Sequence, residues 1–185
     1  LEPALLALKE AGVSADGAFA PSYKTSDRFV IPMAAATPFE AATLAAPFSC
    51  ALTGVNQVRL RPDDKTVVLG GGTMGLMYAH ALSLKGIRGT IVDISSERLK
   101  LTEQAAPYGW NVAGSFEKAR FQFNHGRCDV VVDTTSVMLE KTLPCINRGA
   151  RIVLVGRCNG GAQIKPAELA DKSISLISSI VRIGT

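Results

Sequence analysis

The chain has 185 residues, of which 47% are hydrophobic and 19% are charged, and its formal net charge is +4. This composition is typical of a globular protein with an apolar core and excludes a disordered chain. Lysines and arginines are scattered singly and aromatic residues are few, so we expect no nucleic-acid interface. No apolar run approaches the roughly 20 residues of a membrane-spanning helix. We therefore expect no membrane segment, and the absence of a visible secretory leader or cysteine framework favours a cytoplasmic location.

The first third of the sequence mixes helical and loop patterns. Leucine spacing predicts a helix over 3–11, and the segment 28–32 (Arg-Phe-Val-Ile-Pro) predicts a short strand. Thr37 and Pro38 are typical of a helix start, so we expect a helix from there towards Pro47 and a second helix over 48–58. We place a domain boundary after this second helix, with a small remnant of one domain and its linking helices over 1–58 and a larger domain over 59–185.

From residue 65 onwards, short apolar strands alternate with helices. The predicted strands are 65–69, 90–93, 110–113, 129–133, 151–155 and 173–177, and the predicted helices are 73–85, 97–106, 116–125 and 137–147. Continuous apolar strands separated by helices indicate a parallel sheet that is covered on both faces. Because crossovers between parallel strands are right-handed, the expected fold is α/β, a doubly wound six-stranded sheet of the Rossmann type.

A glycine-rich loop, residues 70–75 (Gly-Gly-Gly-Thr-Met-Gly), connects the first of these strands to a helix. Gly70 permits a sharp turn, Gly72 lets the backbone approach a diphosphate, and Gly75 lets the helix pack close to the strand. The free N–H groups at the helix start then favour a bound phosphate. No Gly-Lys-Ser/Thr sequence ends the loop, which excludes a P-loop. A glycine-rich turn without a ligand is the alternative.

Residues that follow three other predicted strands are candidates for binding the rest of a dinucleotide. Asp93 can accept hydrogen bonds from the adenosine ribose and would repel a 2′-phosphate, which favours NAD over NADP. Its alternative role is that of an acid at a helix start. Arg98 either reaches over the ribose or is a solvated helix residue. Thr134 and Gly156 follow the fourth and fifth strands, where the backbone borders the nicotinamide or simply turns.

Four segments resemble the zinc-type medium-chain alcohol and polyol dehydrogenases. They are residues 67–76 (Val-Val-Leu-Gly-Gly-Gly-Thr-Met-Gly-Leu), 91–99 (Ile-Val-Asp-Ile-Ser-Ser-Glu-Arg-Leu), 128–135 and 149–156, within a resemblance that covers 16–180. It implies NAD(H), a small alcohol or carbonyl substrate, and a homo-oligomer formed through the sheet edge at 173–183. It further implies that the diphosphate is held by Gly70, Gly72, Thr73, Met74 and Gly75, and the ribose by Asp93 and Arg98.

Two departures from the family pattern bear on the chemistry. The family's larger catalytic domain, with most zinc ligands and the proton relay, has no counterpart in these residues. Ala46 stands before Pro47, where the family often has a zinc ligand. Cys50, one helical turn later, is either a metal ligand or, as we prefer, a buried thiol. Zinc is therefore implied by the family alone. We assign no metal ligand and no catalytic residue, and we interpret His80 and His125 as structural or exposed.

Three functions compete. The leading hypothesis is the cofactor-binding part of an NAD-dependent dehydrogenase, active as a full protein and inactive as this chain alone. The second is a non-catalytic dinucleotide-binding module or degenerate dehydrogenase relative, which Ala46 favours. The third is an S-adenosylmethionine methyltransferase, whose glycine loop usually follows an acidic residue, whereas Leu69 precedes Gly70 here.

Overall fold

The computed structural model describes residues 12, 15–121, 126–155 and 165–179. The chain divides into two compact units, Leu1–Ala42 and Thr43–Thr185. This division differs from the boundary expected after residue 58. Helix α2 (Ala45–Gln57) packs against α3 (Thr73–Leu84) and contacts β6 (Ser175–Ser178), so it lies in the same unit as the sheet.

The first unit has little regular structure in its described part. The strand predicted over 28–32 is wrong: Asp27–Phe29 form a 3₁₀ turn, in which the Asp27 carboxylate accepts the Arg28 N–H at 2.8 Å. Val30 and Ile31 follow with 56% and 89% exposure, because no strand in the described part of this unit pairs with them. Helix α1 spans only Phe39–Ala42. The helix predicted over 3–11 lies outside the described residues.

Pro47 does not separate two helices as expected. Helix α2 begins at Ala45, which places Pro47 in its first turn. A proline is tolerated there because the N–H groups of a first helical turn have no partner within the helix.

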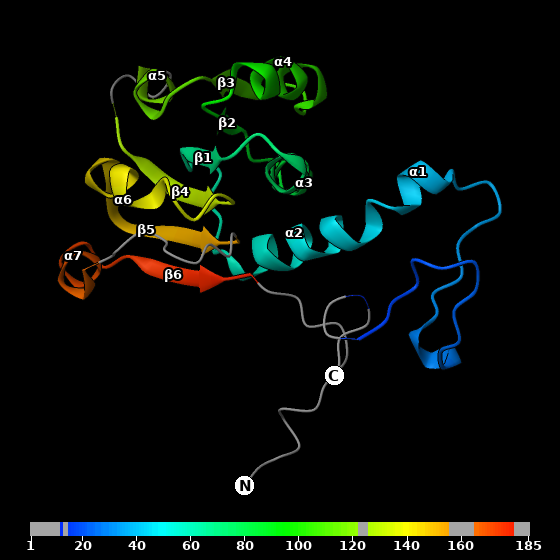
Figure 1. Ribbon diagram of the computed structural model, residues 1–185. Coiled ribbons are helices and arrows are strands. Elements are labelled where there is room, and N and C mark those ends of the chain that lie inside the picture. The colour runs from blue at the N-terminus through cyan, green and yellow to red at the C-terminus, as the bar shows by residue number, and fades with distance from the viewer. Residues whose placement is uncertain (1–11, 13–14, 122–125, 156–164, 180–185) are drawn as a thin grey trace, which may run out of the picture. The chain divides into compact units, whose positions relative to one another are not determined.

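The second unit contains the predicted parallel sheet (Figure 1). Its strands are β1 (Thr66–Leu69), β2 (Gly89–Val92), β3 (Asn111–Ala113), β4 (Cys128–Asp133), β5 (Ile146–Leu154) and β6. Their order is β3-β2-β1-β4-β5-β6, and every neighbouring pair is parallel. The Rossmann prediction is therefore confirmed, with the order of a doubly wound sheet in which the strand order reverses between β1 and β4.

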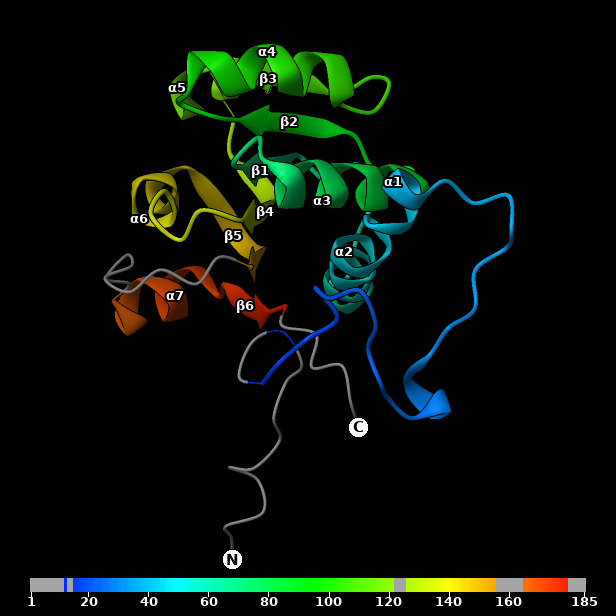
Figure 2. The same cartoon turned by 45° about the vertical axis from the view of Figure 1, so that its right-hand side comes forward.

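Helices cover both faces of this sheet. Besides α2 and α3 they are α4 (Ser96–Ala105), α5 (Phe116–Phe121), α6 (Leu139–Thr142) and α7 (Pro166–Lys172). Helices α2 and α3 lie on one side of the sheet and α6 and α7 on the other (Figure 2). Successive residues of β1 belong to two apolar clusters on opposite faces of the sheet. Val68 packs with Tyr78 and Leu82 on one face, and Val67 packs with Leu139 on the other. None of the helices in the described segments is long and apolar enough to cross a membrane.

The region after β4 differs from the prediction. The helix expected over 137–147 is reduced to α6 and a 3₁₀ turn at Leu143–Cys145, because Pro144 has no N–H to continue a helix. Strand β5 then starts at Ile146, and its Gly149 has a φ of +72°. Helix α7 (Pro166–Lys172), which was not predicted, is followed by Ser173, whose φ is +53°.

A buried hydrogen-bonded junction holds α2, α3 and β6 together. The Tyr78 hydroxyl donates to Ser179 Oγ at 2.6 Å, and Ser179 Oγ donates to the Cys50 carbonyl at 3.3 Å. Burial raises the pKa of the Tyr78 phenol, so it stays a donor. A Cβ atom at Gly54 would overlap both Tyr78 Oη and Ser179 Oγ. The close approach of α2 therefore requires glycine at this position.

Replacing Gly54 by alanine is expected to destabilise the protein, although Gly→Ala in a helix is normally stabilising. The overlap should cost about 1–3 kcal/mol in the free energy of unfolding. Urea unfolding would measure it, with the exposed Asn56→Ala in the same helix as a control that should change stability by about 0.5 kcal/mol or less. A stabilised Gly54→Ala variant would contradict this packing.

Candidate functional site

A cleft opens at the carboxyl ends of β1, β2 and β4. Its volume is about 340 Å³, within the range of small-molecule sites. It is lined by Gly70, Gly72, Met74, Asp93, Ile94, Arg98, Thr134, Thr135, Val137 and Met138. The cleft lies where the strand order reverses between β1 and β4, which is the position at which open α/β sheets bind ligands. The fold thus brings six of the nine predicted site residues together.

The glycine loop has the conformation that its predicted roles require. Gly70 has a φ of +99°, and a Cβ there would overlap Thr134 Oγ1. A Cβ at Gly75 would overlap the Gly70 carbonyl oxygen, so Gly75 allows α3 to start directly against the loop. At Gly72, by contrast, a Cβ would meet nothing within 4 Å. The loop therefore leaves open space beside Gly72, and Thr73, the first residue of α3, is exposed next to it.

Asp93 is tied to the glycine loop as well as to its own helix. Its Oδ2 accepts the Gly71 N–H at 2.8 Å, and its Oδ1 accepts the Ser95 N–H at 2.9 Å. The Arg98 Nε lies 3.4 Å from Oδ2, and the Arg98 side chain is 59% exposed. Asp93 itself is 5% exposed. Since each carboxylate oxygen has two acceptor positions, the Asp93 carboxylate keeps unused capacity at the edge of the cleft.

The loop after β4 is organised by a residue that sequence reasoning missed. Asp133 Oδ1 accepts the Thr135 N–H at 2.9 Å, the Thr135 hydroxyl at 2.7 Å and the Ser136 N–H at 3.0 Å. Ser136 has a φ of +61°, a left-handed conformation that is uncommon for serine. Asp133 Oδ2 is buried with no hydrogen-bond partner among the described residues. In the sequence, Asp133 is the last residue of an apolar strand, and only its position before two threonines hints at this turn.

Thr134, predicted to border the nicotinamide, faces the cleft from this same loop. Its hydroxyl donates to the Leu69 carbonyl at 2.7 Å, which joins the ends of β4 and β1. Gly156, predicted beside it, lies outside the described residues, and so do His125 and Cys158.

The described residues contain no cluster suited to zinc. No three His, Cys, Asp or Glu side chains gather there in a way that could hold a metal ion. Cys50 is half-buried with a free thiol. Burial raises the pKa of the Cys128 thiol to about 12, which keeps it protonated at neutral pH. His80 is exposed, with Nε2 lying 3.1 Å from the Ala105 carbonyl oxygen.

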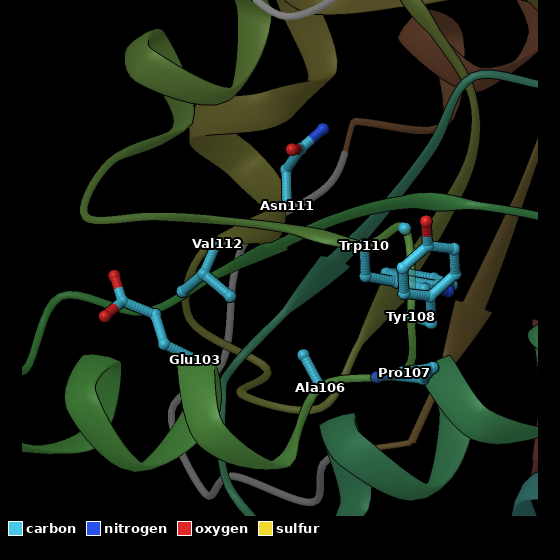
Figure 3. Close-up of a pocket in the computed structure, with 8 residues that line it drawn as sticks. Glu103, Ala106, Pro107, Tyr108, Trp110, Asn111 and Val112 are labelled. Carbon is cyan, nitrogen blue, oxygen red and sulfur yellow. The ribbon is translucent and has the colours of Figure 1, made fainter.

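A second cleft of about 340 Å³ lies away from the glycine loop. It is lined by Glu103, Ala106, Pro107, Tyr108, Gly109, Trp110, Asn111 and Val112 (Figure 3). These residues surround the start of β3, whereas the glycine loop follows the end of β1. Because parallel strands all begin at the same edge of a sheet, the two clefts lie at opposite edges. None of the predicted site residues lines this second cleft.

Replacing Asp133 tests its role in shaping the first cleft. Asp133→Ala leaves the Thr135 and Ser136 donors without their acceptor and should lower the free energy of unfolding by about 1–3 kcal/mol. Asp133→Asn keeps an oxygen at the Oδ1 position, so its loss should be smaller. Urea unfolding of both variants would measure this, and equal losses would show that the acceptor at Oδ1 does not hold the turn.

Comparisons with known proteins agree with this geometry. The family model described as zinc-binding dehydrogenase matches residues 72–183. D-arabinitol dehydrogenase 1 of Uromyces fabae is 27% identical over 184 residues, covering 93% of this chain and 52% of that protein. The chain therefore spans about half the length of this curated relative.

Two solved structures share the fold. A protein described as a short chain alcohol dehydrogenase from Escherichia coli, in complex with NADH, has a TM-score of 0.78 at 22% identity, over 91% of this chain and 52% of that one. The quinone oxidoreductase of Thermus thermophilus, also solved with NADPH, has a TM-score of 0.65 at 20% identity, over 80% of this chain and 49% of that one.

Proposed function

The chain belongs to the zinc-binding dehydrogenase family, and we propose that it is the cofactor-binding part of an NAD-dependent enzyme that oxidises an alcohol or polyol by hydride transfer. The observation that carries this proposal is the cleft at the carboxyl ends of the strands, which combines an open glycine loop with a carboxylate at its edge. The similarity to D-arabinitol dehydrogenase 1, whose name denotes a polyol substrate, supports the substrate class.

Each part of the cleft suits one part of the dinucleotide. The diphosphate is assigned to Gly70, Gly72, Thr73, Met74 and Gly75, the adenosine ribose to Asp93 and Arg98, and the nicotinamide to Thr134 and Gly156. The space beside Gly72 and the start of α3 supply room and N–H donors for an anion. When bound, the nicotinamide supplies the hydride chemistry. The chain's own residues bind and orient the cofactor.

NAD is the proposed cofactor because of the carboxylate at the ribose position. A 2′-phosphate beside Asp93 would meet a buried negative charge that already has donors from Gly71 and Ser95. Arg98 offsets part of this repulsion, but its side chain is largely exposed and is already paired with the Asp93 carboxylate. NADP should therefore bind more weakly than NAD.

The rest of the proposal concerns the whole protein. We assign substrate binding, proton transfer and any zinc ion to residues beyond those in this chain, so the chain alone should bind cofactor without oxidising an alcohol. A cytoplasmic homo-oligomer that forms through β6 completes the proposal. Strand β6 pairs only with β5 in the described sheet, and Leu176 on it is 41% exposed.

The second candidate is a non-catalytic dinucleotide-binding module. Ala46, at the position where the family often has a metal ligand, favours it. Zinc analysis and alcohol oxidation by the complete protein would separate the two candidates, because only the enzyme should show activity.

Ligand-induced stabilisation tests the proposed cofactor. At a concentration of a hundred times its Kd, a true ligand should add about 2.7 kcal/mol to the free energy of unfolding. With all three ligands at one concentration, a hundred times the Kd of NADH, thermal unfolding should show this shift for NADH, a smaller one for NADPH, and none for S-adenosylmethionine. A shift with S-adenosylmethionine alone would contradict the proposed dinucleotide function.

The ribose role of Asp93 can be separated from its bond to the loop. Asp93→Ser should raise the Kd of NADH more than that of NADPH, because loss of the loop bond affects both cofactors and loss of the ribose acceptor affects only NADH. Fluorescence titration would give both constants, and the exposed Glu97→Ser nearby is a matched control. An equal loss for the two cofactors would leave Asp93 with a structural role alone.

A further inference from the structure

Thr102 lies in α4, outside both clefts, and yet it contacts the glycine loop. It is fully buried, and its Oγ1 lies 2.9 Å from the Gly71 carbonyl oxygen and 2.7 Å from the Arg98 carbonyl oxygen. The Arg98 carbonyl is four residues earlier in the same helix, where the α-helical pattern already provides a backbone donor. The Gly71 carbonyl stands in a loop, so it depends more on this hydroxyl.

Two side chains, those of Asp93 and Thr102, therefore hold the two backbone polar groups of Gly71. Its N–H donates to Asp93 and its carbonyl accepts from Thr102. The C=O and N–H groups of a trans peptide point in opposite directions, and the described residues contain no cis peptide. The Gly72 N–H, which shares a peptide with the Gly71 carbonyl, must therefore point away from Thr102. Gly72 lines the cleft and Thr102 does not.

The fit between Gly71 and Thr102 is also steric. A Cβ at Gly71 would overlap Thr102 Oγ1 and would lie 3.3 Å from Thr102 Cγ2. Gly70 has a positive φ, whereas Gly71 does not. Glycine is therefore required at 71 mainly by the close approach of Thr102, with Asp93 Cβ also 3.3 Å from the added atom, and not by a positive φ.

We propose that Thr102 is a positioning residue for cofactor binding: its hydroxyl fixes the Gly71–Gly72 peptide and so directs the Gly72 N–H towards the diphosphate. This inference builds on the proposed dinucleotide function. It adds a residue of α4 that does not line the cleft to the residues that position the glycine loop.

A conservative pair of variants tests the hydroxyl. Thr102→Val preserves the shape of the side chain and removes the donor, so the Kd for NADH should rise about tenfold, as for the loss of one hydrogen bond. Thr102→Ser keeps the donor and should stay within about twofold of the wild type. Both are measured by NADH fluorescence on the 185-residue chain, well below the unfolding midpoint of each variant. Unchanged binding by Thr102→Val would overturn the proposal.

A second pair covers the case in which Thr102→Val does not fold. Gly71→Ala should weaken NADH binding through the overlap with Thr102 Oγ1. Adding Thr102→Ala makes room for the new Cβ but leaves the Gly71 carbonyl without its donor, so NADH binding should remain weak. Full recovery in the double variant would show that steric fit alone matters and would overturn the role of the hydroxyl.

Failure of the proposed function would give a different result. If the wild-type chain binds neither NADH nor NADPH, the dinucleotide assignment fails, and the proposal for Thr102 fails with it as a claim about cofactor binding. Amide hydrogen exchange of the ligand-free chain then tests whether the Thr102 hydroxyl holds the Gly71 carbonyl. Thr102→Val should speed exchange of the Gly71 amide at least tenfold while Val68 in β1 is unaffected. Unchanged exchange at Gly71 would show that the hydroxyl does not hold the loop.

Discussion

The hydrogen bond from the Gly71 N–H to the Asp93 carboxylate is the interaction on which the site depends. It joins the loop after β1 to the end of β2 over 2.8 Å. A buried carboxylate is costly without donors, and this one receives them from Gly71, from Ser95 and from the nearby Arg98. In return, the loop is fixed with open space at Gly72. The negative charge and the anion-binding loop are thus positioned before any ligand arrives, which reduces the ordering that binding must pay for.

The sheet and the glycine loop could be predicted because their causes are local. Continuous apolar runs indicated β1, β2 and β4. The rule that crossovers between parallel strands are right-handed then predicted a doubly wound sheet. Gly86, with a φ of +76°, follows α3 as a glycine at a helix end should. Gly70 and Gly75 could be assigned from spacing alone, since a strand, a tight turn and a helix leave room for only one arrangement. The region after β4 was less predictable, because Pro144 ends an apparently helical pattern in a 3₁₀ turn, and β5 then starts at Ile146.

Contacts between segments that lie far apart in the sequence could not be predicted. The Thr102 hydroxyl and the Gly71 carbonyl are 31 residues apart, and the sequence of α4 does not distinguish Thr102 from the exposed polar residues of that helix. The turn held by Asp133 depends on the hydrogen bonds that Oδ1 accepts from Thr135 and Ser136, which no spacing reveals. The strand expected over 28–32 shows the opposite error, since β-branched residues favour a strand only where another strand is available to pair with. Sequence reasoning therefore identified the residues of the cleft better than the residues that support it.

The central claim is that a dinucleotide diphosphate lies against the glycine loop. The most direct test is an ¹⁵N–¹H spectrum of the chain titrated with NADH. The account predicts that the amide signals of Gly72 and Thr73 shift most, with that of Asp93, while those of Tyr108 and Trp110 in the second cleft stay unchanged. Shifts confined to the second cleft, or none at the glycine loop with NADH at saturation, would contradict it.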